Sequence, residues 1–561
     1  MNETFRVGVV RGISYGLFGP PGEFVPQARA LGAGLVRAYL YWSQVEPEPG
    51  RFDWTTTDAL LAQLDGDEEA WLTVVSSSPW ATQRPATFLP PSPAKDIADY
   101  ERFAAALVER CRGRIRYFQC DNEPSNAALL WAGTADAYVA QLRALHRAVH
   151  AGAPGAQVVL GGCGYDVLSS AEGSPERAFF DRVLSLGGDA FDAFDVHLYG
   201  SPERVGDYVE QARAMMRRHG CERPLLAGEH GGPVLFEFPE LEPILAATFA
   251  ALPADPASLA AESSPERRAM AALYARMDEL PPRLQMLMEG CPAELSAKRD
   301  RIACRQVVTR TVRALAAGVT RTAYWNLAPE IPGYRDRYQI MDLLFGRLPL
   351  LDFDGDGVLT RRHPAADTFA LLVGELAGAT RIHRAAEPAP PGGTDALRPA
   401  GDVGPRGGAD LLALDHERQH HERQRDGGGE ALAPGGERSR GGWLDAPGPD
   451  RERPRSGSDG APRASGEQQR YDAGPHTSRP AHEPRRRWEA YRVERPGRGP
   501  LWIAWAEGDT FDGEDQPPVE LSLPWDSSTA AAVDAFGVPV PVECGGGVIR
   551  IAASVTPVFV G

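Results

Sequence analysis

The chain has 561 residues, more than one hydrophobic core usually organises, so we expect at least two domains. Hydrophobic residues make up 43% of the sequence, which excludes global disorder. The formal net charge of −17 disfavours nucleic acid and anionic membranes as partners, because both bind clustered positive charge, and it is compatible with a neutral polar substrate.

Seven cysteines occur without a CxxC pair or a metal-ligand spacing, so we expect mostly reduced core residues in a reducing compartment. Residues 1–16 lack the basic and apolar regions of a signal peptide, and no apolar run is long enough to span a bilayer. From these features we expect a cytoplasmic protein without a cofactor.

Short apolar runs bounded by glycine and proline alternate with amphipathic helical patterns up to about residue 382. The predicted strands are 5–10, 35–41, 71–76, 115–120, 157–162, 193–199, 224–228 and 321–326. Helical patterns between them include Ala98–Arg110, Ala135–Ala151 and Glu203–Arg218. Eight strands alternating with helices predict an α/β fold, a closed (β/α)8 TIM barrel over residues 1–383.

A doubly wound open sheet is the alternative to a barrel. That fold would place a glycine-rich phosphate loop directly after the first strand. The segment Arg11–Gly16 follows the first strand here and lacks the GxGxxG pattern, which favours the barrel.

The seventh unit of the predicted barrel carries a long helical insertion at about 233–317. Its helical patterns are Pro265–Leu280 and Lys298–Ala317, with Ser264 as the expected N-cap and Pro281–Pro282 as the expected end of the first helix. Because large loops of barrel enzymes lie at the C-terminal face of the strands, we expect the insertion to wall or cap the active site.

Residues 384–487 are dominated by Gly, Pro, Arg, Asp and Ala, and they carry too little apolar surface to offset the entropy of ordering. One interpretation is a disordered linker. Another is a compensated frameshift in a GC-rich gene, which fits the presence of only two lysines, Lys95 and Lys298, among 59 basic residues.

Beyond this segment the pattern of strands resumes. The predicted strands are Trp488–Glu494, Leu501–Ala506, Val519–Pro524, Ala531–Asp534 and Gly547–Ala552. Short strands separated by turns predict a small antiparallel β-domain over residues 488–561.

Two glutamates follow apolar runs at the ends of predicted barrel strands. Glu123 follows the fourth strand and Glu229 follows the seventh, so both are expected at the C-terminal face, where barrel active sites lie. A lone glutamate at a strand end is commonly a cap or a surface ion pair. Here Asn122 supplies an amide beside Glu123, and Pro124 disfavours helix at the glutamate itself, so the pair predicts glycosidic bond chemistry.

The surrounding motifs resemble those of clan A glycoside hydrolases, over about residues 5–382. The matching segments are Arg37–Trp54 on the second strand, Asn122–Pro124 on the fourth, His197–Tyr199 on the sixth, Gly228–Gly231 on the seventh and Trp325–Asn326 on the eighth. The similarity is nearest to xylosidase-like and iduronidase-like members, with cellulase-like and β-galactosidase-like members behind. It implies a retaining enzyme, with Glu123 as general acid/base and Glu229 as nucleophile.

The resemblance also implies roles for substrate-binding residues. Asn122 would hold the sugar 2-hydroxyl, Arg37 would steady the nucleophile, and Tyr199 would bond Glu229. The remaining implied contacts are those of His197 at the floor of the −1 subsite and Trp325 stacked on the sugar. Arg37, His197 and Trp325 each have a plainer interpretation. Arg37 could form an ion pair in the barrel interior, His197 could be a hydrogen-bonded core histidine, and Trp325 could serve packing alone.

Two features depart from the family pattern. Asp121 precedes Asn122, where many members carry an aromatic or small residue, and this carboxylate could raise the pKa of Glu123 or point away. The long insertion in the seventh unit is also unusual, so the geometry of the subsites is not carried over.

Two further motifs concern metals. Asp352, Asp354 and Asp356 have the spacing of the first part of an EF-hand loop, but the twelfth position is His363 and not the bidentate Glu; a polar turn is the alternative to a calcium site. The histidine-rich run 415–422 falls in the segment interpreted as disordered, and we expect no metal there.

The predicted function is therefore a retaining glycoside hydrolase acting on an oligosaccharide or glycoside. The alternatives are a non-catalytic carbohydrate-binding barrel and a metal-dependent barrel hydrolase, although His197 and His230 are the only histidines at predicted strand ends. The sequence does not determine the sugar, the linkage, exo or endo action, or the oligomeric state.

Overall fold

The computed structural model describes residues 4–250, 264–331, 335–385 and 487–561. Eight parallel strands close into a barrel in the order β1 to β8, as the sequence predicts. The strands are β1 Arg6–Val10, β2 Leu35–Tyr41, β3 Glu69–Val75, β4 Tyr117–Cys120, β5 Gln157–Cys163, β6 Ala193–His197, β7 Leu225–His230 and β8 Arg321–Tyr324. All eight predicted barrel strands are confirmed to within a few residues at their ends.

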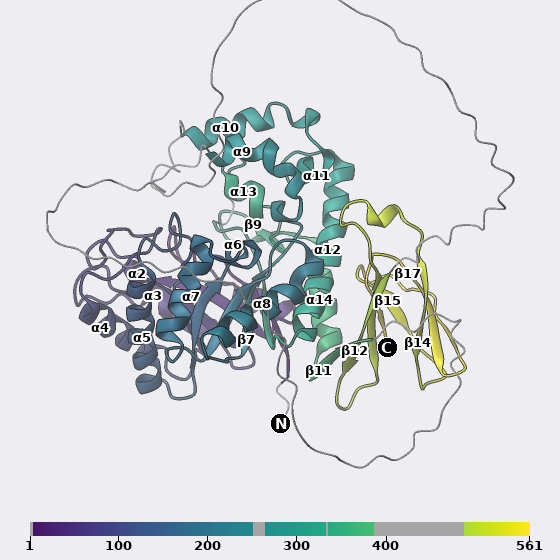
Figure 1. Cartoon of the computed structure of the whole chain (residues 1–561), viewed down its shortest axis with the longest axis horizontal. Helices are drawn as coiled ribbons and strands as arrows, with labels where there is room; N and C mark the ends of the chain where they lie inside the picture. The colour runs from purple at the N-terminus through teal and green to yellow at the C-terminus, as the bar shows by residue number, and fades with distance from the viewer. Residues whose placement is uncertain (1–3, 251–263, 332–334, 386–486) are drawn as a thin grey trace, which may run out of the picture. The chain divides into compact units, whose positions relative to one another are not determined.

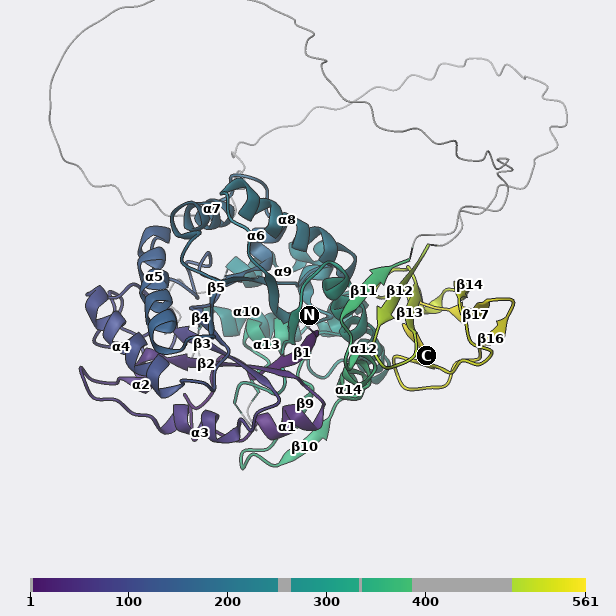
Figure 2. The ribbon, with the colours of Figure 1, turned by 90° about the horizontal axis from the view of Figure 1, so that it is seen from below.

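Helices surround the barrel strands (Figure 2). They are α1 Val25–Ala30, α2 Trp42–Val45, α3 Thr55–Gln63, α4 Ile97–Arg110, α5 Ala135–Gly152, α6 Tyr165–Ser169, α7 Pro175–Gly187, α8 Val205–Arg218, α12 Ala293–Ala316 and α14 Pro364–Leu376. Side-chain caps begin several of them: Asp96 accepts from Ala98 N before α4, and Thr134 accepts from Ala137 N before α5.

Alternation along β2 separates the interior of the barrel from its outer layer. Leu35 and Tyr39 belong to the cluster inside the barrel, whereas Val36 and Leu40 pack in the cluster between strands and helices. All seven residues of β2 are buried, as expected for a strand covered on both faces. Arg37 shares the inward parity of Leu35 and Tyr39, so the strand period itself sends its guanidinium into the barrel.

The insertion after β7 folds around its own apolar core. Its helices are α9 Glu242–Ala250, α10 Pro265–Tyr274 and α11 Pro282–Gln285; helix α13, Ile340–Phe345, lies beside them in Figure 1. Leu245, Met270, Leu284 and Leu343 belong to one buried cluster. The insertion therefore carries hydrophobic packing separate from the barrel interior.

The expected ends of these helices need correction. Ser264 is the N-cap of α10, as predicted, but the helix ends at Tyr274 and not at Pro281–Pro282. A 3-10 turn follows, and Pro282 begins α11, because proline has no N–H and suits the first turn of a helix. Helix α12 starts at Ala293, before the predicted Lys298.

The segment with EF-hand spacing forms a β-hairpin, made of β9 (Leu351–Phe353) and β10 (Leu359–Arg362). Asp354 Oδ1 accepts from the backbone N–H groups of Asp356 and Val358, so it closes the turn. Asp352 binds Arg335 at 2.5 Å and His363 at 2.9 Å. The side chains of Asp352 and Asp354 thus take part in the hairpin and its turn, and helix α14 begins directly after His363.

A C-terminal domain of antiparallel sheets follows the barrel, as predicted. One sheet has the order β11-β12-β13-β18-β15 and the other β14-β17-β16. The strands are β11 Arg381–Arg384, β12 Trp488–Glu494, β13 Leu501–Ala506, β14 Val519–Pro524, β15 Ala532–Asp534, β16 Glu543–Gly545, β17 Val548–Ala553 and β18 Val558–Val560. Strand β11 pairs with β12, although its residues fall at the end of the range expected for the barrel.

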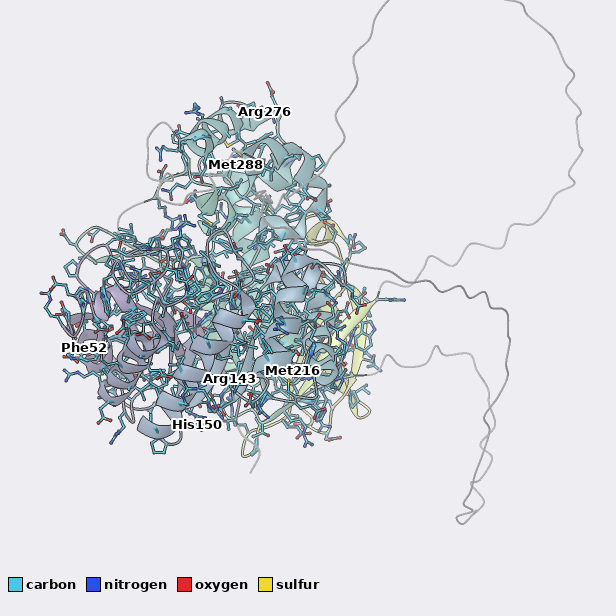
Figure 3. The ribbon with its side chains drawn as sticks, turned by 60° about the vertical axis from the view of Figure 1, so that its left-hand side comes forward. Phe52, Arg143, His150, Met216, Arg276 and Met288 are labelled. Atoms are coloured by element: carbon cyan, nitrogen blue, oxygen red, sulfur yellow. The ribbon has the colours of Figure 1, made fainter. Side chains whose placement is uncertain are left out.

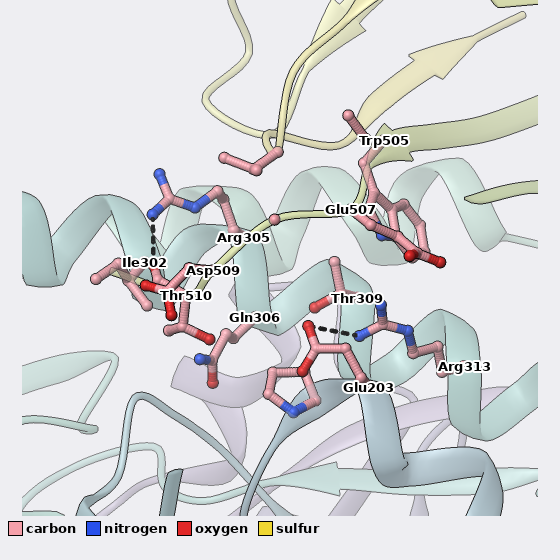
Figure 4. A pocket seen from close by; sticks show the side chains of 14 residues that line it. Glu203, Ile302, Arg305, Gln306, Thr309, Arg313, Trp505, Glu507, Asp509 and Thr510 are labelled. Atoms are coloured by element: carbon pink, nitrogen blue, oxygen red, sulfur yellow. Dashed lines mark hydrogen bonds and ion pairs between the residues drawn. The ribbon is translucent and has the colours of Figure 1, made fainter. Parts of the chain in front are cut away.

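Helix α12 connects the barrel to these sheets within one compact unit. Arg313 binds Glu489 of β12 at 3.0 Å, and both side chains are buried. A cavity of about 40 Å³ lies beside this contact, lined in part by Glu203, Arg305 and Trp505 (Figure 4). It is far smaller than the roughly 300–1,000 Å³ typical of ligand sites.

Several expectations meet the boundaries of the described residues. The interpretations of the segment 384–487 as a linker or a frameshift, and the histidine-rich run 415–422, fall almost wholly in 386–486, outside the described residues. All seven cysteines lie within the described residues and none forms a disulfide. In the described part of the chain, no helix combines the length and apolar character that a bilayer span requires.

Candidate active site

A bulge in β7 turns Glu229 into the mouth of the barrel. Leu226 faces the barrel interior and Ala227 the outer layer, so strict alternation would send Glu229 outward. Asp195 and His197 of β6, however, pair with Leu226 and Glu229 of β7. The β7 segment between these pairs is one residue longer than the β6 segment. This extra residue reverses the parity at the strand end and re-aims the carboxylate.

Three side chains hold the Glu229 carboxylate, two from β2 and one from the segment just after β6. Arg37 and Tyr39 of β2 each donate to Oε1 at 2.8 Å, and Tyr199 donates to Oε2 at 3.0 Å. The Arg37 side chain is fully buried, and the Glu229 carboxylate, 2.8 Å away, balances its charge. Glu229 is thus oriented at both of its carboxylate oxygens.

Glu123 reaches the mouth from the turn after β4. Asp121 and Glu123 have positive φ angles, of 51° and 39°, which is uncommon for residues with a side chain. Asp121 points away from the mouth and accepts from Ser76 N and Ser76 Oγ at 2.7 Å. Burial, opposed by these hydrogen bonds, raises the pKa of Asp121 to about 7.

His197 joins the two glutamates. Its Nδ1 lies 2.5 Å from Glu123 Oε1 and 3.4 Å from Glu229 Oε2, while its Nε2 lies 3.0 Å from Asp195 Oδ2. One carboxylate oxygen of Glu123, one of Glu229 and a ring nitrogen of His197 all lie within 4.8 Å of one another. The two glutamates therefore meet at one place, as the sequence motifs predict for an active site.

The surroundings of His197 keep it protonated. Burial by itself disfavours the imidazolium, but the charges of Glu229, Asp195 and Glu123 outweigh it and raise the pKa of His197 to about 10. The ring therefore donates from both nitrogens, one to Glu123 and one to Asp195. It is fully buried, so it acts on the site through these bonds and charges.

A buried polar network supports these residues from below. Arg37 also donates to Gln119 at 2.6 Å and to Asn122 Oδ1 at 2.7 Å. Gln119 in turn donates to Asp195 at 2.7 Å and accepts from Thr73 at 2.7 Å. Every member has partners, which is the condition under which a buried polar network rigidifies a site.

Gly162 leaves room for the His197 ring. Strand β5 carries a bulge where it faces β6, and an added Cβ at Gly162 would collide with the His197 imidazole. Only glycine allows the ring to lie against the β5 backbone at this point. Glycine is needed at position 162 because of the His197 side chain on the next strand. No pattern in the neighbouring sequence predicts this need.

A further carboxylate, Asp166 of α6, stands beside Glu123. The two side chains flank Gly164, where an added Cβ would collide with Asp166 and lie 3.0 Å from Glu123 Oε1. Ser125 donates to Asp166 Oδ2 at 3.2 Å. Burial and the nearby charge of Glu123 raise the pKa of Asp166 to about 7.

Aromatic rings surround the mouth of the barrel. Trp325, only 7% exposed, lies at the end of β8, with Phe345 of α13 6.3 Å away in a T-shaped contact. Phe345 also lies 5.5 Å from Tyr199, and Phe236 from the start of the insertion stacks on Tyr165 at 5.1 Å. The insertion thus contributes a ring to the wall of the mouth, in line with its expected position.

The acidic cluster also bears on the metal-dependent alternative. Glu123, His197 and Glu229 form a group whose geometry could hold an ion. Its carboxylates already accept from the cationic side chains Arg37 and His197, so a metal ion would replace charges that the protein itself supplies.

Burial lowers the pKa of His230 to about 3, and this neutral ring has no hydrogen-bond partner among the described residues.

Sequence reasoning missed Tyr39, Thr73, Gln119, Asp195 and Asp166. The first four lie on predicted strands, and Tyr39 shares the parity of Arg37, so polar residues at inward positions were a usable signal. Asp166 lies after β5 and had no such signal. The structure brings together Glu123, Glu229, Arg37, Asn122, His197 and Tyr199; Trp325 lies at the same mouth.

Comparisons with known proteins concern the fold. No family model and no curated protein matches the chain. Its structure is similar to that of a family 39 glycoside hydrolase from Bacteroides cellulosilyticus, with a TM-score of 0.54 and 10% identity, over 100% of this chain and 81% of that chain. This likeness confirms, for the fold, the predicted resemblance to clan A glycoside hydrolases.

Two other solved structures give lower scores. A glucosidase from Croceicoccus marinus has a TM-score of 0.42 and 15% identity, over 66% of this chain and 68% of that chain. A GH5_18 protein from Streptomyces cattleya, in complex with GlcNAc, has a TM-score of 0.43 and 16% identity, over 67% of this chain and 81% of that chain.

Proposed function

We propose that the chain is a retaining glycoside hydrolase in which Glu229 is the nucleophile and Glu123 the general acid/base. The observation that carries this proposal is the approach of the two carboxylates, with oxygens within 4.8 Å of each other at the mouth of the barrel. Retaining enzymes place their carboxyl groups about 5–5.5 Å apart, whereas inverting enzymes leave roughly 6.5–9.5 Å for a water molecule. The fold shared with a family 39 glycoside hydrolase supports the same reaction class.

In the first step, Glu229 attacks the anomeric carbon and Glu123 protonates the departing glycosidic oxygen. The carbon–oxygen bond to the leaving group breaks as the bond to Glu229 forms, which gives a glycosyl-enzyme ester and a free alcohol. Arg37, Tyr39 and Tyr199 orient the attacking carboxylate. Glu123 gives its own proton to that oxygen, and His197 Nδ1, 2.5 Å from Glu123 Oε1, stabilises the carboxylate that remains.

In the second step, Glu123 takes a proton from a water molecule, and the hydroxide attacks the anomeric carbon. The ester bond to Glu229 breaks, the sugar leaves with its original anomeric configuration, and Glu123 regains the proton that it gave. Imidazolium at His197 lies between the two glutamates and stabilises whichever carboxylate carries the charge at each stage.

The test is hydrolysis of a panel of aryl glycosides, with NMR of the first-formed sugar. We expect the product to keep the anomeric configuration of the substrate. Glu123→Gln should lower kcat/KM by about 10²–10⁴-fold for poor leaving groups, and Glu229→Ala should lower it at least as far for all substrates. Added azide should restore turnover in Glu229→Ala and give a glycosyl azide of inverted configuration.

A surface carboxylate provides the matched control. Glu101 is paired with Arg147 on the outer helices, so Glu101→Gln should retain wild-type turnover. Equal turnover by wild type and Glu229→Ala would remove the nucleophile assignment, and an inverted first product would remove the retaining mechanism. Sugar binding without turnover on any substrate would instead identify a carbohydrate-binding barrel.

A further inference from the structure

A second cluster of metal-ligating side chains lies on the outer layer of the barrel, away from the mouth. His146 and His150 are four residues apart on α5, so they share one face of the helix. Their ring centroids are 4.0 Å apart. His150 Nε2 lies 3.0 Å from Oδ2 of Asp192, the residue that precedes β6.

We propose that His146, His150 and Asp192 form a binding site for a zinc-class transition metal ion. One nitrogen of each histidine and one oxygen of the aspartate all lie within 4.8 Å of one another. Zinc takes imidazole nitrogen at about 2.0–2.1 Å and carboxylate oxygen at about 2.0–2.2 Å, in tetrahedral arrangement, so the three atoms need only close around a common centre. Imidazole suits Zn²⁺, Cu²⁺ and Ni²⁺, which sets the class of ion.

The immediate surroundings suit a cation. Asp192 Oδ2 accepts from Val158 N at 2.8 Å, which anchors the carboxylate to the start of β5. The guanidinium of Arg143, also on α5, donates to both oxygens of Asp189 at 2.9 and 2.7 Å, so it is paired with a carboxylate other than Asp192.

The site is also reachable from solvent. The side chain of His150 is 48% exposed and that of Asp192 26%. Figure 3 shows His150 and Arg143 on the outer side of the molecule, away from the insertion that carries Arg276 and Met288. Three protein ligands with an open side leave the fourth position to water, and the ion can enter without opening the fold.

The effect expected of the ion is on stability. Asp192 and Val158 lie at the amino ends of β6 and β5, whereas Glu123 and Glu229 lie at the carboxyl ends of β4 and β7. A bound ion would tie α5 to the amino end of β6, and any ion that binds only the folded chain shifts unfolding to higher temperature. The rate of the proposed glycosidase reaction should not depend on it.

The test uses the full chain after removal of metals with a chelator. We expect calorimetry with zinc sulfate to show one bound ion per chain, cobalt(II) to give the visible absorption of a tetrahedral site, and the midpoint of thermal unfolding to rise with zinc. His150→Ala and Asp192→Asn should each weaken zinc binding by at least about tenfold and abolish the thermal shift, with hydrolysis unchanged.

His219 supplies a matched control, because it also pairs with an aspartate, Asp181, at 2.9 Å, but has no second histidine beside it. His219→Ala should bind zinc as the wild type does. The proposal is overturned if the wild type binds no zinc, or if zinc binding survives in both site variants and is lost in Glu229→Gln, which would move the ion to the barrel mouth.

Discussion

A positive charge at His197 lies among three carboxylates at the centre of the site. Glu229, Asp195 and Glu123 raise its pKa to about 10 against the effect of burial. A histidine raised in this way stabilises the folded state fully below its ordinary pKa of 6.5, and this contribution is lost as the pH rises from there to about 10. The site is therefore organised by an imidazolium at neutral pH.

The charge of His197 can be observed directly. In protein labelled with 15N-histidine, we expect the ring signals of His197 to stay those of imidazolium up to pH 8 or above, with a midpoint near pH 10. Glu229→Gln removes one of the carboxylates that favour the proton, so the midpoint should move to lower pH. A wild-type midpoint near 6.5 would contradict this description of the site.

Asp166 places a second carboxyl group beside Glu123, the proposed acid/base residue. Its pKa is raised to about 7 by burial and by Glu123, and the other titratable group acting on it is Glu176. We expect Asp166→Asn to change the kcat/KM profile around and above pH 7, where the substitution removes the negative charge of Asp166 from beside Glu123, with a smaller change in KM. An unchanged profile would assign Asp166 to loop structure alone, and Asp181→Asn, outside the mouth, serves as the control.

At the scale of elements, helix α12 positions the loop after β6. Arg310, fully buried on α12, donates to the carbonyl oxygens of Leu198 at 3.0 Å and Gly200 at 2.5 Å. These carbonyls flank Tyr199, which bonds Glu229. Arg310 also binds Glu237 at 2.8 Å, so one guanidinium fastens the ends of two barrel loops to the helix.

Arg310→Lys tests this arrangement, because lysine keeps the charge near Glu237 but lacks the planar fork. We expect kcat to fall by roughly tenfold to a hundredfold through misplacement of Tyr199, with KM changed less. Arg213→Lys is the matched control, since Arg213 also donates to a backbone carbonyl, that of Ala317, away from the mouth. Equal losses of kcat in the two variants would contradict a role for Arg310 in positioning.

On the scale of the whole molecule, the barrel and the C-terminal sheets share buried contacts. Arg313 of α12 pairs with Glu489 of β12, and Thr368 of α14 donates to Ala535 O at 2.6 Å. Arg313 also lies over the Trp505 ring at 5.3 Å. Because these contacts are buried, loss of the sheets should destabilise the barrel as well.

Glu489→Ala leaves Arg313 without its buried partner. We expect it to lower the free energy of unfolding by roughly 3–5 kcal/mol, the usual cost of breaking a buried pair, in a single transition seen by both tryptophan fluorescence and circular dichroism. Burial opposes ionisation of Glu489, but Arg313 lowers its pKa, so the stabilising effect is present above its ordinary pKa of 4.5 and is lost at lower pH. Two separate transitions in the wild type would contradict the shared contact.

Much of this protein follows from its sequence alone. Apolar runs at strand length, broken by glycine and proline, determine the eight barrel strands, because burial of both strand faces needs continuous apolar sequence, and short strands separated by turns determine the later β-domain. The motifs around Glu123 and Glu229 determine which carboxylates to examine. These signals are local, so a linear sequence carries them.

Other features were decided only by the tertiary structure. The bulge that turns Glu229 inward depends on how β7 pairs with β6 and β8. The sequence of β7 by itself does not predict this register shift. Asp166 reaches Glu123, and Arg310 holds the loop of Tyr199, across large separations in the chain. Register and cross-strand contact are set by how strands pair and helices pack, which is a property of the whole fold and not of any segment.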